Sequence, residues 1–305
     1  VIEIDGTEVD SLAVSATVNS LAFNSDGSML AAGMSDGVYK VFFIEHGTWV
    51  QVHTSVIYGT SINVVVFSPD DDLLAFGTSK GEIQLRSMSD GSLSKTIKGP
   101  SDGVFSLAFS PDGTMLTAGC GDGYTRAWSL SGGLLYELNG MTQRVQSIAF
   151  SPDGTMLASG TEEGRIHLWK PEEGITPIGT LEGLSAEVRS LAFYSDAGSL
   201  ISASLDGKVI SWNTISLTPV HEKGDFSMPV LFTIQKPGTD LLAQGLVDGS
   251  IRLQSISEGE TQVLLKGLPD SLGIKFGDND NEKLYSVSSE GIGWWIPGDT
   301  TQPDP

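Results

Sequence analysis

Two stretches of this sequence carry the spacing of a hydrolase nucleophile. Gly-x-Ser-x-Gly occurs at residues 33–37 and again at residues 77–81. In hydrolases such a serine sits on a sharp turn between a strand and a helix, with a histidine and an acid elsewhere in the fold. The same two glycines recur without the serine at residues 119–123 and 160–164. Because the spacing recurs without the nucleophile, we attribute it to a structural repeat and expect no catalysis there.

The other groups that could do chemistry are scattered along the chain. The four histidines lack the HxH and HExxH spacings that bring two rings to one metal ion, so we expect each to be solvated or hydrogen-bonded: His46, His53, His167 and His221. Cys120 is the sole cysteine, which excludes an internal disulfide and a cysteine-based metal site. It stands where other copies of the repeat have Thr78, Thr161 and Ser204, so we expect a buried, inert thiol.

One acidic segment offers alternating oxygen ligands, as a calcium-binding loop does. These ligands are Asp278, Asp280 and Glu282. The segment lacks the sixth-position glycine and the distal glutamate of an EF-hand, and it occupies the place of a polar turn. We therefore predict no metal site and no cofactor, with calcium at these three residues as the alternative.

The charge balance restricts the class of partner. Asp and Glu number 38 and Lys and Arg 17, which gives a net charge of −21. Such a surface repels phosphate backbones and anionic headgroups, so we expect no nucleic-acid binding, and no apolar run is long enough for membrane insertion. A protein partner with a basic patch fits this charge better. The chain begins at Val1 without a signal-peptide pattern, from which we expect a processed mature chain or an excised region.

The candidate residues belong to a repeat of about 42 residues that fills the chain. Each copy has an apolar run that ends in Phe, a turn such as Ser-Pro-Asp-Gly, a second apolar run, an acidic-Gly turn and a run that ends near Trp. Apolar and polar residues alternate within the runs, which is the period of a half-buried strand. The second-turn glycine marks seven copies: Gly37, Gly81, Gly123, Gly164, Gly207, Gly249 and Gly291.

These copies resemble the WD40 repeats of β-propeller proteins. The resemblance implies an all-β fold, a seven-bladed β-propeller of four-stranded antiparallel blades, with residues 1–296 as one domain and 297–305 as a tail or linker. The last copy has no fourth run, whereas residues 8–14 form a spare run ahead of the first copy. We therefore expect this N-terminal strand to complete the last blade and close the ring, with residues 1–4 as a further strand or a flap.

The sequence departs from the WD40 pattern in its polar signature. Where the family commonly has Gly-His, histidine is replaced by Met141, Leu184 and Leu268, and the Trp of the Trp-Asp pair is followed by Ser129, Lys170 or Asn213. We expect the family's buried Asp–His–Ser/Thr–Trp hydrogen-bond network to be absent, so that packing around Phe, Leu and Trp holds each blade.

The resemblance also places the partner-binding face. In WD40-like propellers, partners dock on the face formed by the second-turn loops and the loops that lead into each blade. The residue four before the first-run aromatic position should lie at the channel mouth. This predicts a binding patch of Phe105, Gln146 and Arg189 in neighbouring blades, with Arg144 beside them and Val230 next in the ring. The second-turn acids next to it are read as ordinary turn residues, and Phe232 as core.

The leading function is a non-catalytic platform for protein–protein interaction within a larger protein or complex. Two alternatives stay open. The first is a propeller enzyme or small-ligand binder that uses the central channel, which converging histidines or carboxylates would favour. The second is a structural subunit of an extracytoplasmic assembly, with which the start of the chain, the acidic surface and the Thr/Pro tail are compatible. An apolar, arginine-bearing channel rim would favour the platform.

Overall fold

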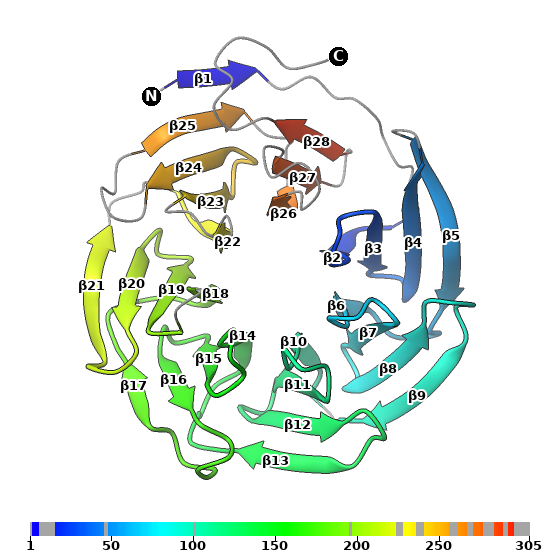
Figure 1. Ribbon diagram of the computed structural model, residues 1–305, viewed down its shortest axis with the longest axis horizontal. Helices are drawn as coiled ribbons and strands as arrows, with labels where there is room; N and C mark the ends of the chain where they lie inside the picture. Colours follow the sequence, from blue (N-terminus) through cyan, green and yellow to red (C-terminus); the bar gives the residue numbers. More distant parts are fainter. Residues whose placement is uncertain are drawn as a thin grey trace.

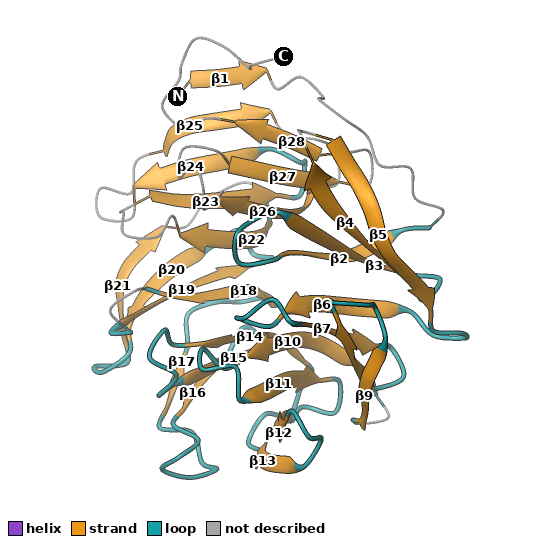
Figure 2. Cartoon of the chain, turned by 45° about the vertical axis from the view of Figure 1, so that its right-hand side comes forward, coloured by secondary structure: helices purple, strands orange, loops and turns teal. Residues whose placement is uncertain are grey.

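Strands make up the regular structure of the chain. A computed structural model describes residues 2–5, 16–45, 48–99, 102–194, 197–223, 228–235, 241–255, 261–266, 271–276, 284–288 and 292–295. The strands form sheets arranged in a circle, and each sheet runs from an inner strand at a central opening to an outer strand at the rim (Figure 1). Figure 2 shows strands and loops throughout this described part, in which no helix is long and apolar enough to span a membrane.

Six sheets of the described residues contain four antiparallel strands in chain order, and they are called blades 1 to 6 here. Blades 1 to 3 are formed by β2 (Val18–Phe23), β3 (Met29–Met34), β4 (Val38–Glu45), β5 (Thr48–Val56); β6 (Ile62–Phe67), β7 (Leu73–Thr78), β8 (Glu82–Ser87), β9 (Leu93–Lys98); and β10 (Val104–Phe109), β11 (Met115–Cys120), β12 (Thr125–Ser129), β13 (Leu134–Leu138). Blades 4 to 6 are formed by β14 (Val145–Phe150), β15 (Leu157–Thr161), β16 (Ile166–Trp169), β17 (Gly179–Leu181); β18 (Val188–Phe193), β19 (Ser199–Ser204), β20 (Val209–Asn213), β21 (Thr218–Lys223); and β22 (Val230–Gln235), β23 (Leu241–Leu246), β24 (Ile251–Ser255), β25 (Thr261–Lys266).

The seventh repeat differs from the expected complete blade. Its described strands are three, β26 (Ser271–Phe276), β27 (Leu284–Ser288) and β28 (Ile292–Trp295), so the structure shows six four-stranded blades where the sequence predicts seven. The inner strand β26 contacts β22 of blade 6 and β2 of blade 1, which places this three-stranded sheet between the two ends of the blade series (Figure 1).

The N-terminal segment joins a different sheet from the one that we expected to be completed. Strand β1 (Ile2–Asp5) pairs in parallel with β25 and adds a fifth strand to blade 6. Residues 8–14, which we expected to complete the last blade, lie outside the described residues, as do the calcium candidates Asp278, Asp280 and Glu282 and the tail 297–305.

Close approach between blades explains the recurring glycines. A Cβ atom on Gly160 of β15 would lie 2.6 Å from Cγ1 of Val188 in the next blade, and one on Gly119 of β11 would lie 2.8 Å from Cγ1 of Val145. Both valines are fully buried. The second glycine of each pair sits in a strand-to-strand turn with positive φ, for example +84° at Gly123. The spacing that resembles a nucleophile motif therefore serves packing and turn geometry.

Part of the polar network that we expected to be absent is present. The indole nitrogen of Trp212 donates to Ser202 Oγ at 2.8 Å, and that of Trp169 donates to Ser159 Oγ at 3.2 Å. Leu184, at a position where the family has histidine, is buried in the same apolar cluster as Trp212. The prediction was wrong for the Ser–Trp link, since that link needs no histidine.

Candidate functional site

A β-bulge interrupts the first strand of each of blades 1 to 6, and in blades 1 to 5 it places one side chain at the central channel. In blade 3, Val104 pairs with Cys120 and Ser106 with Gly119, which leaves Phe105 as the extra residue of β10. Such a bulge releases the extra residue from the alternation of the strand and re-aims its side chain. The same shift in the other blades makes the bulge residues Asn19, Asn63, Gln146, Arg189 and Leu231.

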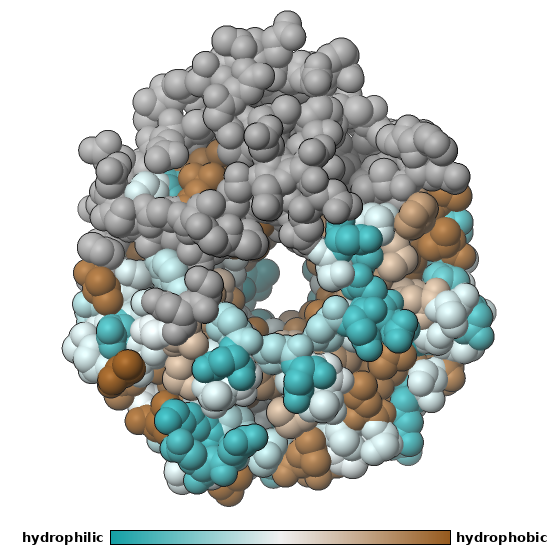
Figure 3. Space-filling model, in the orientation of Figure 1, coloured by the Kyte–Doolittle hydropathy of each residue, from teal (hydrophilic) through white to brown (hydrophobic). Residues whose placement is uncertain are grey.

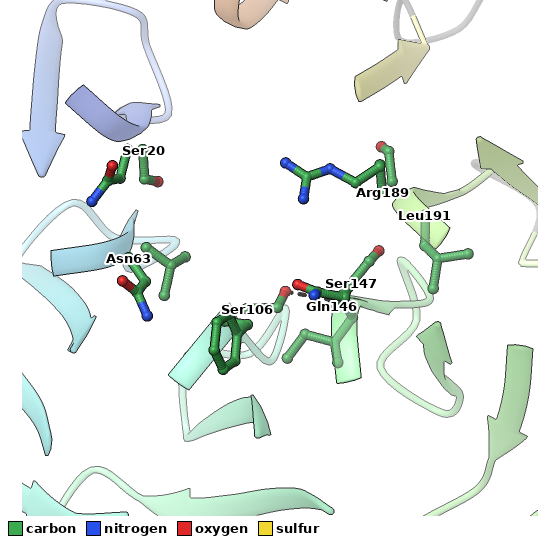
Figure 4. Close-up of a pocket in the computed structure, with 12 residues that line it drawn as sticks. Ser20, Asn63, Ser106, Gln146, Ser147, Arg189 and Leu191 are labelled. Atoms are coloured by element: carbon green, nitrogen blue, oxygen red, sulfur yellow. Dashed lines mark hydrogen bonds between the residues drawn. The ribbon is translucent and has the colours of Figure 1, made fainter. Parts of the chain in front are cut away.

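Five of these side chains converge on a cavity at the channel. Its volume is about 440 Å³, and its walls come from the first strands of blades 1 to 5. Figure 3 shows the opening at the centre of the face in view, and Figure 4 shows Asn63, Gln146 and Arg189 around the space between the inner strands. The lining consists of Asn19, Ser20, Asn63, Val64, Phe105, Ser106, Gln146, Ser147, Ile148, Arg189, Ser190 and Leu191.

Phe105 is held in place by the neighbouring blade. The guanidinium carbon of Arg144 lies 4.4 Å from the centre of the Phe105 ring, a cation–π contact. Arg144 precedes β14, and its carbonyl oxygen accepts a hydrogen bond from the Glu162 backbone N–H of the second turn. Arg144 therefore supports Phe105 from behind, and the cavity is lined by Phe105 itself.

Arg189 extends into the cavity from β18 and faces Ser20 and Asn63 on the opposite wall (Figure 4). Its Nη1 donates to Glu187 Oε1 at 2.6 Å. The Arg189 side chain is 41% exposed, so this pair is a partly solvated one of small net stability. The backbone of Glu187 is fixed by the second turn, because its carbonyl oxygen accepts from the Leu205 N–H.

Val230, which we expected on the channel rim, is fully buried in the apolar core between blades 5 and 6. The reason is a shift of one residue in the sixth repeat, in which Gln235 pairs with Leu242 as Phe193 pairs with Leu200. The sequence-based alignment placed Ile234 at the aromatic position. This shift of one residue assigned every side chain of the strand to the wrong face. Leu231 is the bulge residue, and Phe232 takes the register position of Ser190, with its ring over Gly245. Phe232 packs against the buried apolar cluster of blade 6, as the sequence predicts.

The serines that follow the bulges were missed as channel residues by sequence reasoning. Ser20, Ser106 and Ser190 each accept, at 3.1 Å, a hydrogen bond from a backbone N–H of the next blade. The side-chain amides of Asn19 and Asn63 likewise donate to the next blade. These bonds fix the channel wall before any partner binds. Their signal in the sequence is a serine two residues after the first valine of a repeat.

Sequence comparison identifies the family of this scaffold. The family described as WD domain, G-beta repeat matches residues 6–42, 91–129, 132–170 and 175–213, which together make up about half of the chain. The chain belongs to the WD40 repeat family. The matches cover all or part of blades 1 to 5, which contribute the five inner strands that line the cavity.

Two relatives share a stretch of this WD40 propeller. It is 32% identical over 110 residues to the periodic tryptophan protein 2 homolog of Neurospora crassa, a stretch that covers 36% of this chain and 12% of the relative. It is 28% identical over 120 residues to periodic tryptophan protein 2 of Saccharomyces cerevisiae, which covers 39% of this chain and 13% of the relative. The matched stretch is thus about an eighth of the length of each relative.

The remaining candidates lie away from the channel of the WD40 propeller. Cys120 is buried, and burial raises the pKa of its thiol to about 12. His167 is buried, which lowers its pKa, and its Nδ1 pairs with Thr180 Oγ1 at 3.1 Å. Four of the second-turn acids each accept a hydrogen bond from the backbone N–H two residues ahead, namely Asp36, Asp122, Asp206 and Asp248. Among the described residues no group of three His, Cys, Asp or Glu is arranged to hold a metal ion.

Proposed function

We propose that this WD40 propeller is a non-catalytic platform that binds a protein partner at the channel mouth. One observation carries the proposal: five consecutive bulges turn one side chain each toward a single cavity. The described lining contains amides, hydroxyls, apolar groups and one arginine, without histidine or carboxylate. This is the composition that favours an interaction site over a catalytic centre.

The geometry also supports binding without a large rearrangement. The cavity wall is fixed by hydrogen bonds from blade to blade, and Phe105 is backed by Arg144. A partner therefore meets a site whose side chains are already ordered, which reduces the entropy lost on binding. The net charge of −21 favours a partner that is basic over most of its own surface.

The test is affinity capture from an extract of the source organism, followed by mass spectrometry. We expect the unaltered chain to retain a partner and Phe105→Ala or Gln146→Ala to retain roughly fivefold less or lower, since anchor residues dominate interfaces. Lys170→Ala is the matched control, because Lys170 is partly exposed and lies outside the cavity.

The fold of each variant is checked by its thermal unfolding midpoint. Gln146→Ala keeps the stack of Arg144 on Phe105, so it guards against a loss caused by misfolding. Equal capture by the unaltered chain and both cavity variants would overturn the channel mouth as the site.

We also infer that residues 8–14 supply the fourth strand of the last sheet and complete a seventh blade. Two observations support this. Leu284 pairs with Trp295 in the last sheet as Leu200 pairs with Trp212 in blade 5, so the seventh repeat follows the register of the others. In addition, β26 lies between β22 and β2, where a seventh blade belongs.

A further inference from the structure

Arg189 is the one charged residue among the described residues that line the cavity. The protein as a whole carries a net charge of −21, so this cation at the central channel is opposite in sign to the net charge. The other polar lining groups are the amides of Asn19, Asn63 and Gln146 and the four serine hydroxyls, which are uncharged donors and acceptors.

The pair with Glu187 uses one of the nitrogen atoms of the Arg189 guanidinium. Its bond to Glu187 uses Nη1, and a guanidinium carries five N–H donors in a planar fork that matches a carboxylate. Glu187 belongs to the loop that leads into blade 5 and does not line the cavity. Glu187 is only 17% exposed, so breaking its pair would leave a largely buried carboxylate without a counter-ion. A carboxylate inside the cavity can instead be bound by the Arg189 donors that the pair with Glu187 does not use.

We propose that the channel mouth takes up a carboxylate from an extended segment of the partner protein, an Asp or Glu side chain or a chain terminus, with Arg189 as its counter-ion. This inference rests on the function proposed above and adds the chemistry of the contact. A cavity of about 440 Å³ holds one or two side chains and not a folded domain.

The single arginine decides between a carboxylate and a phosphate. Phosphorylated segments carry close to two negative charges and are bound by clusters of arginine. Here one guanidinium lines the described cavity, in a protein whose net charge repels a second negative charge. A monoanion matches this site in charge, and the neighbouring amide of Gln146 offers both a donor and an acceptor to the backbone of the same segment.

The test begins with a random peptide library panned on the immobilised chain. The selected consensus peptide is then synthesised in three forms: with its acid, with the amide isostere (Asn for Asp, Gln for Glu, or an amidated terminus), and with phosphoserine in place of the acid. Fluorescence anisotropy gives the Kd of each form for the unaltered chain and for Arg189→Gln. Arg165→Gln is the matched control, because it also removes one arginine that pairs with a glutamate but lies outside the cavity.

We expect an acidic consensus that binds Arg189→Gln at least tenfold more weakly and Arg165→Gln within twofold. The amide isostere should bind the unaltered chain more weakly than the acid by the same factor. It should bind Arg189→Gln no more weakly than the acid does, since both changes remove the same contact. Enrichment of peptides without an acid, equal binding to Arg189→Gln, tighter binding of the phosphoserine form, or failure of the library to yield a binder would each overturn the proposal.

A free small carboxylate is the competing occupant, and citrate and glutamate are titrated as probes in a separate arm. Binding of these probes without peptide binding would overturn the peptide proposal. The two proposals can be told apart. If capture of the partner depends on Phe105 and Gln146 but not on Arg189, the carboxylate proposal is overturned and the proposed platform function is supported.

Discussion

At the scale of single residues, short polar side chains fix the turns at the ends of the inner strands. Ser110 Oγ donates to Asp112 at 2.6 Å and accepts from the Met115 N–H at 2.9 Å. Ser151 and Asp153 repeat the arrangement in blade 4. The serine hydroxyl lowers the pKa of each aspartate below its ordinary value of 3.8.

This direction of shift determines how stability responds to acid. A carboxyl whose pKa is lower in the folded state stabilises the protein above its unfolded pKa of 3.8, and the gain is lost as the pH falls through the lower folded value. We predict that Asp112→Asn/Asp153→Asn melts at a lower temperature than the unaltered chain at pH 6 and that the gap narrows by pH 3. Thermal unfolding followed by circular dichroism measures both midpoints.

The control for this experiment is Glu172→Gln, which removes an exposed acid near the same blade. Its thermal midpoint should equal that of the unaltered chain across the pH range. A gap between the double variant and the unaltered chain that stays constant or widens toward pH 3 would contradict the role given to the two aspartates.

At the scale of elements, two backbone features recur from blade to blade. A bulge in the inner strand turns one side chain to the channel in blades 1 to 5, and a glycine in the second strand lets the next blade approach in blades 1 to 4. The second feature is purely steric at Gly160, whose backbone is not in the left-handed region and whose would-be Cβ lies 2.7 Å from Val188 Cβ.

We predict that Gly160→Ala destabilises the protein by about 1–3 kcal/mol, because an added methyl group overpacks a filled interface. Val188→Ala removes Cγ1, the nearer of the two Val188 atoms that the methyl group strikes, and leaves Cβ in place, so it relieves part of the overlap. The double variant should therefore be more stable than the sum of the two single effects indicates, by roughly 0.5–3 kcal/mol. Urea unfolding of the four proteins gives this coupling.

Gly113→Ala separates steric overlap from backbone strain. Gly113 has φ of +70° and one atom, Pro69 Cδ at 3.9 Å, near its would-be Cβ. Its substitution should lower stability by about 1 kcal/mol through φ alone and show no coupling to Val188→Ala. Additive effects of Gly160→Ala and Val188→Ala would contradict the close-approach explanation.

At the scale of the whole molecule, the first and the last described strands belong to neighbouring sheets. Strand β1 lies on the outer edge of blade 6, and the described part of the last sheet ends with β28 as its outer strand. An uncovered sheet edge can pair with other chains. A segment that covers the edge of the last sheet should therefore contribute more to stability and solubility than β1, which is a fifth strand on blade 6.

We predict that removing residues 1–5 changes the thermal midpoint by a few degrees at most, since it deletes a four-residue strand paired on one side. Removing residues 1–14 should lower the midpoint further and cause self-association, measured by light scattering. Equal behaviour of the two truncated chains would show that residues 8–14 do not close the ring.

The sequence by itself determined the repeat, the strand periods and the all-β propeller, because the spacing of Phe, Gly and Trp is a local property of the chain. It also indicated Phe105, Gln146 and Arg189, since repeats with a clear Phe fix the register of the inner strand. It failed at Val230, where Gln235 replaces the aromatic residue and no local signal fixes the register.

Only the tertiary structure decided what surrounds these residues. The bulges depend on the register of each hairpin. The support of Phe105 by Arg144 and the joining of β1 to blade 6 depend on contacts between different blades or between segments far apart in sequence. The Ser–Trp hydrogen bonds form without the family's histidine because the pairing of adjacent strands brings serine to the indole. Spacing along the chain predicts which residues occupy equivalent positions in successive blades. Packing between blades decides which of these residues face the central channel.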